Sequence, residues 1–381
     1  MTNSVADHTV DSTIPETMTA IRHHKNGGPE VLQLDTDVPV PQPGPKQLLV
    51  RVSVAGLNYV DTYFREGIYP TDLPNILGRE GSGVVVAVGA DVDGAAAAAG
   101  AAGAVGAGGA AKVGDRVAFS EAAGAYAQYC LVDADRAVAV PSGMSDEEAA
   151  AILLQGTTVH ALATGVYPLA TGVYPLDEDS ICVITAGAGG VGQILTRMAK
   201  HLGAKVISLV SSDEKEEIAK ACGADAVLRY EEYTGEEVRR VAEKLRGSDE
   251  EVSASGQPLS GRAGVDVVYD GVGASTFATS LECIRQRGLM CLFGAASGPV
   301  DPVDPQTLNS HGNIYLARPS VNVWTSLPGE YQRRAAEVLR WVSEGVLEVN
   351  VGATYELADA AQAHEDLQAR RTTGSVVLRV E

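Results

Sequence analysis

The spacing of apolar and polar side chains separates a strand-rich first part of the chain from a second part of alternating strands and helices. From Leu48 the run LLVRVSVAGLN alternates apolar with polar positions, and strand-like runs follow at residues 83–88, 115–119 and 125–132. Gly, Pro and Asp separate these runs. The pattern predicts all-β structure over roughly the first third of the chain.

The first clear helix start lies at Ser145, because the run from Ser145 to Glu148 is a capping box and the apolar run AAAILLQ follows it. Beyond Ser180, strand-like runs alternate with amphipathic helical stretches. This alternation is typical of βαβ units, in which the strands form a parallel sheet. The expected strands are residues 181–185, 205–210, 226–229, 265–270 and 289–293.

Four stretches interrupt these patterns. Residues 1–17 have neither a basic nor an apolar region, so we expect a disordered extension rather than a signal peptide, with the folded chain starting near Met18. Residues 94–111 contain eleven Ala and six Gly, which predicts a low-complexity loop, because glycine weakens helices. The heptapeptide LATGVYP occurs twice between residues 162 and 175, and residues 247–264 form a polar, loop-like insertion.

A chain of 381 residues is long enough for two domains. Its formal net charge of −20 argues against a nucleic-acid partner, which would require a positively charged surface. No stretch predicts a membrane span. The cysteines contain no CxxC pair and indicate neither a disulfide framework nor a four-thiolate zinc site, so we interpret them as buried thiols of a cytoplasmic protein. They are Cys130, Cys182, Cys222, Cys283 and Cys291.

The strongest motif in the chain is a glycine fingerprint between a strand and a helix. An apolar strand leads into Gly187, Gly189 and Gly192 in the pattern GxGxxG, and an amphipathic helix opens near Gly190 and Val191. Such glycines permit a tight turn, close approach of the backbone to a pyrophosphate, and close packing of the helix on the strand. The free N–H groups and the dipole at the helix N-terminus favour a diphosphate. The motif predicts dinucleotide binding.

Residues at the end of the second strand indicate which dinucleotide is bound. Sites specific for NAD place an acidic side chain there, whereas this chain has Ser211, Ser212 and Lys215, which suit a 2′-phosphate. Asp213 lies nearby and is compatible with either cofactor. We expect NADPH. Ligands of parallel sheets lie beyond the carboxyl ends of the strands, and the residues expected there are Tyr230, Val272, Phe293 and Gly294.

Several further segments are typical of one enzyme family. They are GLNYVDTYFREGIYP at residues 56–70, GREGSG at 78–83, VGDRV at 113–117, AGGVG at 188–192, VYDGVG at 268–273, RPS at 318–320 and RRTTG at 370–374. Together they resemble the medium-chain dehydrogenase/reductase superfamily, and within it the zinc-independent, zeta-crystallin-like quinone oxidoreductases. The resemblance runs from about Met18 to the C-terminus. It implies an α/β fold: a Rossmann domain with a doubly wound parallel sheet (151–315) and a β-rich GroES-like catalytic domain (18–150 and 316–381).

The resemblance also implies a metal-free site. Zinc-dependent alcohol dehydrogenases of the superfamily have a cysteine near the position of Asn58 and a histidine near that of Arg79, and this chain has neither. By resemblance, Asn58, Tyr63 and Tyr69 are the catalytic residues around the nicotinamide and the acceptor. Two tyrosine rings could enclose a flat quinone, while an amide or hydroxyl donates to the developing oxyanion.

The cofactor contacts that the resemblance implies involve both domains. Thr158 and the turn from Gly189 to Gly192 would line the cofactor. Lys215, Tyr230 and Arg370 would hold the adenosine 2′-phosphate. Phe293 and Gly294 would flank the nicotinamide.

The expected function is therefore NADPH-dependent transfer of a hydride to a quinone without a metal. One alternative is reduction of the C=C bond of an enone or 2-alkenal, which would need a tyrosine to deliver a proton. An alternative of another class is a non-catalytic NADPH-binding protein with a crystallin-like or RNA-binding role, although the acidic charge argues against RNA. The resemblance further implies a homodimer.

Overall fold

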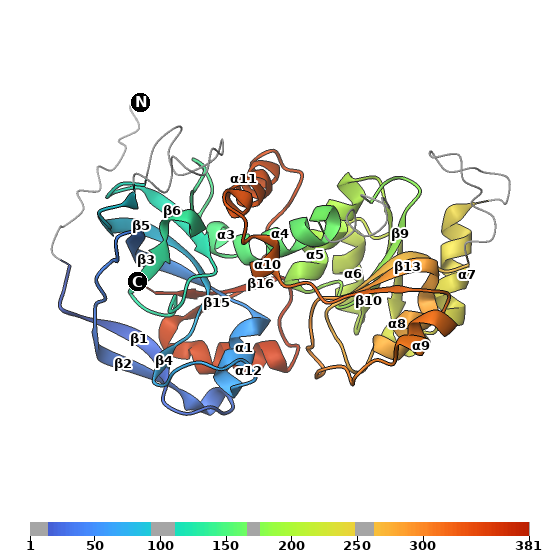
Figure 1. Cartoon of the computed structure of the whole chain (residues 1–381), viewed down its shortest axis with the longest axis horizontal. Coiled ribbons are helices and arrows are strands. Elements are labelled where there is room, and N and C mark those ends of the chain that lie inside the picture. Colours follow the sequence, from blue (N-terminus) through green and yellow to red (C-terminus); the bar gives the residue numbers. More distant parts are fainter. Residues whose placement is uncertain (1–13, 93–110, 166–175, 248–262, 381) are drawn as a thin grey trace.

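The computed structural model describes residues 14–92, 111–165, 176–247 and 263–380, which form two lobes joined by a central group of helices (Figure 1). Several sequence predictions fall outside these residues: most of the N-terminal extension, nearly all of the 94–111 loop, the second copy of the heptapeptide, and most of the 247–264 insertion.

The first lobe combines the early part of the chain with its C-terminal segment. Its strands are β1 (Thr17–His23), β2 (Leu32–Pro39), β3 (Gln47–Leu57), β4 (Asn75–Ile76), β5 (Glu80–Val88), β6 (Arg116–Ser120), β7 (Tyr129–Asp133), β8 (Ala137–Ala139), β15 (Val351–Glu356) and β16 (Ser375–Arg379). Among the described residues, a sheet in the order β15-β16-β3-β5-β6-β8 also pairs with β7 through β3, and a smaller sheet has the order β2-β1-β4. We call this the β-rich lobe.

The early part of the chain contains helices as well as strands, so the prediction of β structure alone is wrong here. Residues Tyr59–Glu66 form helix α1 directly after β3. The main-chain N–H of Asn58 donates to the carboxylate of Asp61 at 2.8 Å, which fixes the start of the helix, and Gly67 ends it in a left-handed conformation. The other helical segments of the lobe are η1 (Pro29–Val31), η2 (Ala134–Arg136), α3 (Asp146–Ala150), η5 (Leu357–Asp359) and α12 (Ala360–Gln368). The capping box at Ser145 is confirmed, since it precedes α3.

The second lobe is the expected doubly wound parallel sheet. Its strands are β9 (Ile181–Ile184), β10 (Lys205–Val210), β11 (Ala226–Arg229), β12 (Val265–Asp270), β13 (Ile284–Leu292) and β14 (Tyr315–Ala317). Within the described residues all of these strands are parallel, in the order β11-β10-β9-β12-β13-β14. The order reverses between β9 and β12, which is the point where doubly wound sheets bind ligands. The helical segments are α5 (Gly190–His201), α6 (Asp213–Ala221), η4 (Tyr230–Glu232), α7 (Gly235–Arg246), α8 (Phe277–Cys283) and α9 (Pro305–Ser310).

The apolar strands of this parallel-sheet lobe are buried on both faces. Cys182 and Ile184 of β9 belong to the cluster that includes α5, whereas Ile181 and Val183 belong to the cluster that includes α7 and α8. Because successive side chains of a strand point to opposite faces, a strand covered on both sides is apolar throughout. This explains why the sequence of β9 lacks alternation.

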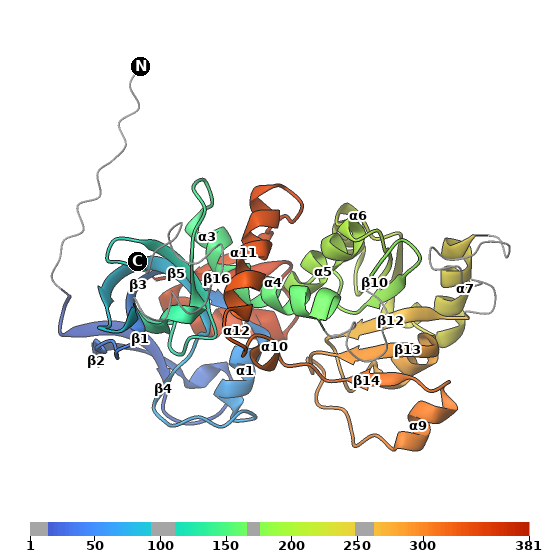
Figure 2. The ribbon, with the colours of Figure 1, turned by 45° about the horizontal axis from the view of Figure 1, so that its top comes forward.

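Helices from distant parts of the chain lie between the lobes (Figure 2). They are α4 (Leu153–His160), η3 (Ala161–Gly165), α10 (Val321–Trp324) and α11 (Glu330–Ser343). The expected domain boundary at 315/316 lies inside β14, which pairs with β13. The exact residues at which the two domains meet therefore stay a prediction. None of the described helices is long and apolar enough to cross a membrane.

Candidate active site

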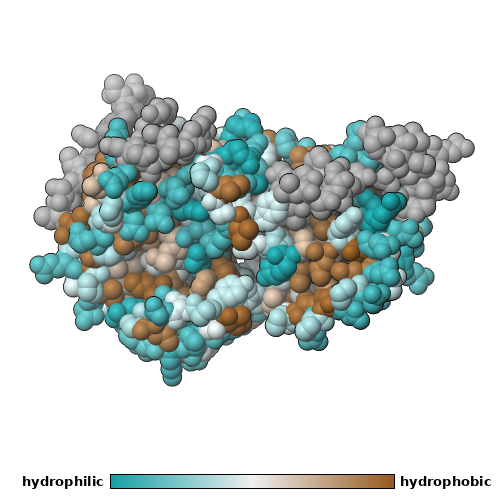
Figure 3. Space-filling view, in the orientation of Figure 1, coloured by the Kyte–Doolittle hydropathy of each residue, from teal (hydrophilic) through white to brown (hydrophobic). Residues whose placement is uncertain are grey.

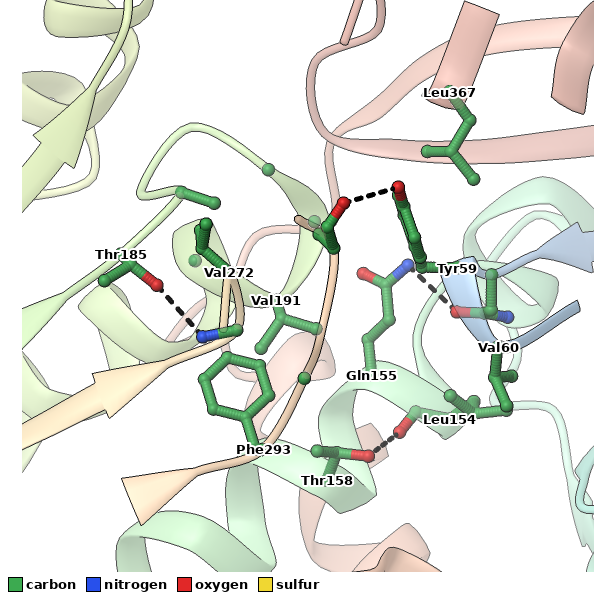
Figure 4. Close-up of a pocket in the computed structure, with 18 of the residues that line it drawn as sticks. Tyr59, Val60, Leu154, Gln155, Thr158, Thr185, Val191, Val272, Phe293 and Leu367 are labelled. Atoms are coloured by element: carbon green, nitrogen blue, oxygen red, sulfur yellow. Dashed lines mark hydrogen bonds between the residues drawn. The ribbon is translucent and has the colours of Figure 1, made fainter. Parts of the chain in front are cut away.

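A pocket of about 470 Å³ lies between the two lobes. Its walls come from α1, α4, the glycine turn before α5, the carboxyl ends of the central parallel strands, α10 and the segment before β16. Figure 4 shows Val191, Val272 and Phe293 on one side of the pocket, with Tyr59 and Gln155 on the other. In the space-filling view apolar surface lies on both sides of the notch between the lobes (Figure 3).

The glycine turn is shaped so that side chains are excluded from it. A Cβ atom on Gly187 would lie 1.7 Å from the hydroxyl of Ser208, and one on Gly192 would lie 2.4 Å from the main-chain oxygen of Ala186. The turn therefore leaves its backbone open to a ligand, and α5 points its free N–H groups there. A dinucleotide diphosphate fits this cradle.

A pair of cations lies at the outer end of the same pocket. Nζ of Lys215 donates to the main-chain oxygen of Arg370 at 2.9 Å, and both residues line the pocket beside Ser211. Burial and the positive charge of Arg370 lower the pKa of Lys215. Two cations held together in this way would gain from a dianion between them, so the residues present fit a 2′-phosphate.

Asp213, which is compatible with either cofactor, is held in an ion pair away from the proposed phosphate site. Asp213 forms an ion pair with Arg229, which also pairs with Glu216 at 3.1 Å. A carboxylate paired with arginine is a weaker obstacle to a phosphate than a free one. Tyr230, on η4, accepts a hydrogen bond of 2.9 Å from the N–H of Ala186 and so lies against the glycine turn.

At the inner end of the pocket, the side chain of Asn58 is held by two buried partners. Its Nδ2 donates to Oε2 of Glu80 at 2.7 Å. Its Oδ1 accepts from Nε2 of Gln155 at 3.3 Å, the hydrogen bond drawn at Gln155 in Figure 4. Gln155 in turn accepts from the hydroxyl of Ser375 at 2.9 Å. Burial raises the pKa of Glu80 to about 8, because the site excludes water from the carboxylate. The network fixes the amide of Asn58 at the pocket wall.

Two tyrosines of α1 join the lobes across the pocket. The hydroxyl of Tyr59 donates to the main-chain oxygen of Ala296 at 3.1 Å, and the hydroxyl of Tyr63 accepts from the N–H of Ala295 at 3.2 Å. Burial raises the pKa of Tyr63 to about 12, so its hydroxyl stays neutral at ordinary pH. The rings of Tyr63 and Tyr69 are 5.5 Å apart at an angle of 75°, so they pack edge to face and do not enclose a flat acceptor between them.

Most of the residues predicted from the sequence line this one pocket. They are Asn58, Tyr63, Tyr69, Thr158, Gly189, Gly190, Val191, Gly192, Ser211, Lys215, Tyr230, Val272, Phe293, Gly294 and Arg370. Gly187 lies in the glycine turn behind the wall, and Ser212 caps α6 by accepting from the N–H of Lys215. Their position in the pocket does not test their catalytic or cofactor-binding roles, which stay predictions.

The sequence reasoning missed Tyr59, Arg79 and Gln155, which also line the pocket. A signal for Gln155 was present, because it is a polar residue within the apolar run AAAILLQ. At Arg79 the sequence indicates only that the histidine of zinc-dependent relatives is absent, and it gives no role for the arginine. Tyr59 offered no local signal.

The donor set at this site does not fit a zinc ion. Asn58 offers an amide and Arg79 a guanidinium, which carries no lone pair for a metal. In the part of the chain that the structure describes, no group of three or more His, Cys, Asp or Glu side chains could hold a metal ion.

Two family descriptions match the chain. The alcohol dehydrogenase GroES-like domain matches residues 44–142, and the zinc-binding dehydrogenase family matches residues 190–344. The quinone oxidoreductases of Pseudomonas aeruginosa and Salmonella typhimurium are 38% and 37% identical to it, covering 92% and 94% of this chain and 96% and 99% of those proteins. A 2-haloacrylate reductase from a Burkholderia species is 33% identical, covering 93% of this chain and 97% of that protein.

Solved structures agree with these sequence matches. A mycobacterial protein complexed with NADPH is 43% identical, with a TM-score of 0.80, and the Escherichia coli quinone oxidoreductase complexed with NADPH is 35% identical with the same score. Each match covers 95% of this chain and 99% of the other.

Proposed function

Because the chain belongs to the quinone oxidoreductase family of the medium-chain dehydrogenases/reductases, we propose that it is an NADPH-dependent quinone reductase that uses no metal ion. The observation that carries the proposal is the pocket itself. It has a cation pair for a 2′-phosphate at one end, a glycine turn for a diphosphate beside it, and Asn58 with aromatic side chains at the other end.

Different residues along the pocket would bind different parts of NADPH. Bound NADPH supplies a hydride from C4 of its nicotinamide ring. Lys215 and Arg370 would hold the 2′-phosphate, and the glycine turn would bind the diphosphate. Phe293 and Thr158, which line the pocket, would flank the nicotinamide.

The acceptor end suits a quinone. A quinone becomes aromatic when it accepts a hydride, so it needs orientation more than strong electrophilic activation. The Asn58 amide, held by Glu80 and Gln155, donates toward an acceptor oxygen as negative charge develops there. Tyr63 and Tyr69 supply aromatic contact surface.

An acceptor assay tests this function directly. The purified protein is mixed with NADPH and 9,10-phenanthrenequinone, and NADPH oxidation is followed by absorbance, with a simple enone in parallel. We expect rapid turnover with the quinone. A titration without affinity for NADPH, or a stoichiometric transition metal in the active protein, would contradict the proposal.

Reduction of an activated C=C bond is a second candidate, because the Burkholderia 2-haloacrylate reductase is similar over nearly the full chain. This reaction needs a proton at the α-carbon. The hydroxyl of Tyr63 is near the acceptor end, but its pKa of about 12 makes it a weak acid. Faster turnover of the enone than of the quinone would favour this candidate.

We also propose a cytoplasmic homodimer. All five cysteines are buried and unpaired, which suits a reducing compartment. The outer strand β14 offers a sheet edge through which a second copy could associate. Neither a nucleic acid nor a membrane is proposed as a partner. Sedimentation of the purified protein measures the oligomeric state.

A further inference from the structure

Arg79 lies at the acceptor end of the pocket, beside the aromatic side chains proposed to contact the acceptor. Its Cζ atom is 5.1 Å from the centre of the Phe64 ring. Phe64 packs edge to face against Tyr69 at 5.5 Å, and Tyr69 packs in the same way against Tyr63. The guanidinium therefore extends a continuous row of aromatic side chains with a positive charge.

The hydrogen bonds of Arg79 leave part of the guanidinium available. Its Nη2 donates to Oε2 of Glu121 at 3.0 Å and to the main-chain oxygen of Glu121 at 3.5 Å. Among the described residues its Nε and Nη1 have no acceptor, and the side chain is 21% exposed. Two nitrogens of a charged group thus keep N–H donors open at the pocket wall.

Arg65, on α1, is an arginine of the same lobe that is fully buried and hydrogen-bonded within the fold, and it serves as a comparison. Its side chain is 0% exposed, and Nε, Nη1 and Nη2 bond to Gly27, His364 and Glu66 respectively. Every nitrogen of Arg65 is used within the fold. Arg79 differs in both respects, which is the arrangement expected of a residue that binds a ligand.

Glu121 is placed by an unusual backbone conformation. Its φ of 65° is in the left-handed region, which is costly for residues other than glycine and is concentrated at functional sites. This conformation directs both its carbonyl and its carboxylate to Arg79. Among the described residues that line the pocket, Glu121 is the one acidic side chain. The negative charge of Glu121 therefore offsets part of the positive charge that Arg79 and Arg318 bring to the pocket.

We propose that Arg79 binds the carbonyl oxygen of the acceptor, and that Glu121 makes the site select uncharged quinones over quinones that carry a sulfonate or carboxylate. The inference rests on the proposed quinone reductase function and extends it to a substrate class. Arg79 holds the acceptor by charge-assisted hydrogen bonds, while the carboxylate of Glu121 repels an anionic substituent.

The quinone accepts a hydride from C4 of the nicotinamide at one carbonyl oxygen, so that a C–H bond breaks and an O–H bond forms. The ring becomes aromatic and the displaced electron pair ends on the other oxygen, which Arg79 stabilises. This hydroquinone anion takes a proton from water, and the products are the hydroquinone and NADP⁺.

The first experiment compares Arg79→Gln and Arg79→Lys with the unchanged protein, using 1,2-naphthoquinone as the uncharged acceptor. Loss of hydrogen bonds from a charged donor is expected to lower kcat/KM for the quinone about 10- to 100-fold. The dissociation constant of NADPH, measured by fluorescence, should stay within about twofold, because Arg79 is at the other end of the pocket from Lys215. Arg379→Gln, at an exposed arginine of the same lobe, is the matched control.

The second experiment removes the charge of Glu121. Glu121→Gln keeps an oxygen that can accept from Nη2 but leaves the guanidinium without its counter-charge. An anionic acceptor, the 4-sulfonate of the same naphthoquinone, should then bind better, with a Michaelis constant about tenfold lower. The Michaelis constant for the uncharged naphthoquinone should change little. Because this variant gains a substrate, a folding defect cannot imitate the expected result.

The outcomes separate the inference from the function on which it rests. If the unchanged protein oxidises NADPH with neither naphthoquinone, the proposed function fails. If it reduces 1,2-naphthoquinone and both Arg79 variants do so equally well, quinone reduction stands and the role of Arg79 is overturned. Equal effects of Glu121→Gln on the two naphthoquinones would overturn the selection against anionic acceptors.

Discussion

The ammonium group of Lys215 donates a 2.9 Å hydrogen bond to the main-chain oxygen of Arg370, although 155 positions separate the two residues in the chain. Lys215 lies on α6 of the parallel-sheet lobe, and Arg370 follows α12 of the β-rich lobe. The proposed phosphate site is therefore built from both lobes, so a bound cofactor would hold the lobes together as well as occupy the pocket.

Lys215→Ala is expected to raise the KM for NADPH about 10- to 100-fold, because a hydrogen bond from a charged donor to the 2′-phosphate is lost. The KM for NADH should change little, since NADH lacks that phosphate. Initial rates at a fixed quinone concentration measure both values. Lys220→Ala is the control, because Lys220 lies on the same helix but pairs with Glu216 and Glu217. An equal effect of Lys215→Ala on both cofactors would show that Lys215 does not recognise the phosphate.

Gly187→Ala is expected to destabilise the fold by about 1–3 kcal/mol and to weaken NADPH binding, because the new Cβ would lie 1.7 Å from the hydroxyl of Ser208. Ser208→Ala removes that hydroxyl and leaves a contact of 3.1 Å, so the double variant should recover most of the lost stability. Thermal unfolding of the two single variants and the double variant measures the coupling. No recovery in the double variant would mean that Gly187 is required for its backbone conformation and not for space.

The parts of the site that the sequence predicted are those formed by residues close together in the chain. Gly187, Gly189 and Gly192 follow a strand and precede a helix, so their spacing alone indicates the turn. Helix α1 was missed because Tyr, Val and Phe favour strands, although Asn58 and Asp61 have the spacing of a helix start. The short strand β14 was also missed, since three residues carry too little pattern.

Contacts between distant residues could not be predicted from a single sequence. Gln155 meets Asn58 across 97 positions and Ser375 across 220, and no local pattern specifies either pairing. Arg79 and Glu121 are 42 positions apart, and their pairing depends on the left-handed backbone of Glu121. Such networks follow from how the sheet brings segments together.

Gln155→Leu is expected to lower kcat/KM for the quinone about tenfold, because Asn58 loses the partner that orients its amide. The NADPH dissociation constant should change less, because the substitution leaves Lys215 and Arg370 in place, although Gln155 also lies against Gly190 of the glycine turn. Gln332→Leu is the matched control: Gln332 is also buried but donates to Asp135, away from the pocket. If both variants lowered kcat/KM equally, the effect would reflect stability and not positioning.

Glu80 should make stability depend on pH. Burial raises its pKa from 4.5 to about 8, so between these values the folded protein keeps a proton that the unfolded chain releases. The contribution of Glu80 to stability is therefore fully present below about pH 4.5 and is lost as the pH rises toward 8, with a slope of up to about 1.4 kcal/mol per pH unit. Glu80→Gln cannot ionise and should lack this slope.

Chemical unfolding at pH 5, 6, 7 and 8 measures the difference. Glu80→Gln should be less stable than the unchanged protein at pH 5, because the Asn58 side chain and the N–H of Leu154 donate to different oxygens of Glu80, and the NH2 group of the new amide would face one of these donors. The difference in the free energy of unfolding between Glu80→Gln and the unchanged protein should decrease steadily toward pH 8. The exposed control Glu356→Gln should have the same free energy of unfolding as the unchanged protein at every pH. A constant gap across this range would mean that Glu80 is ionised in the folded protein, and that Asn58 is held by a carboxylate and not by a protonated acid.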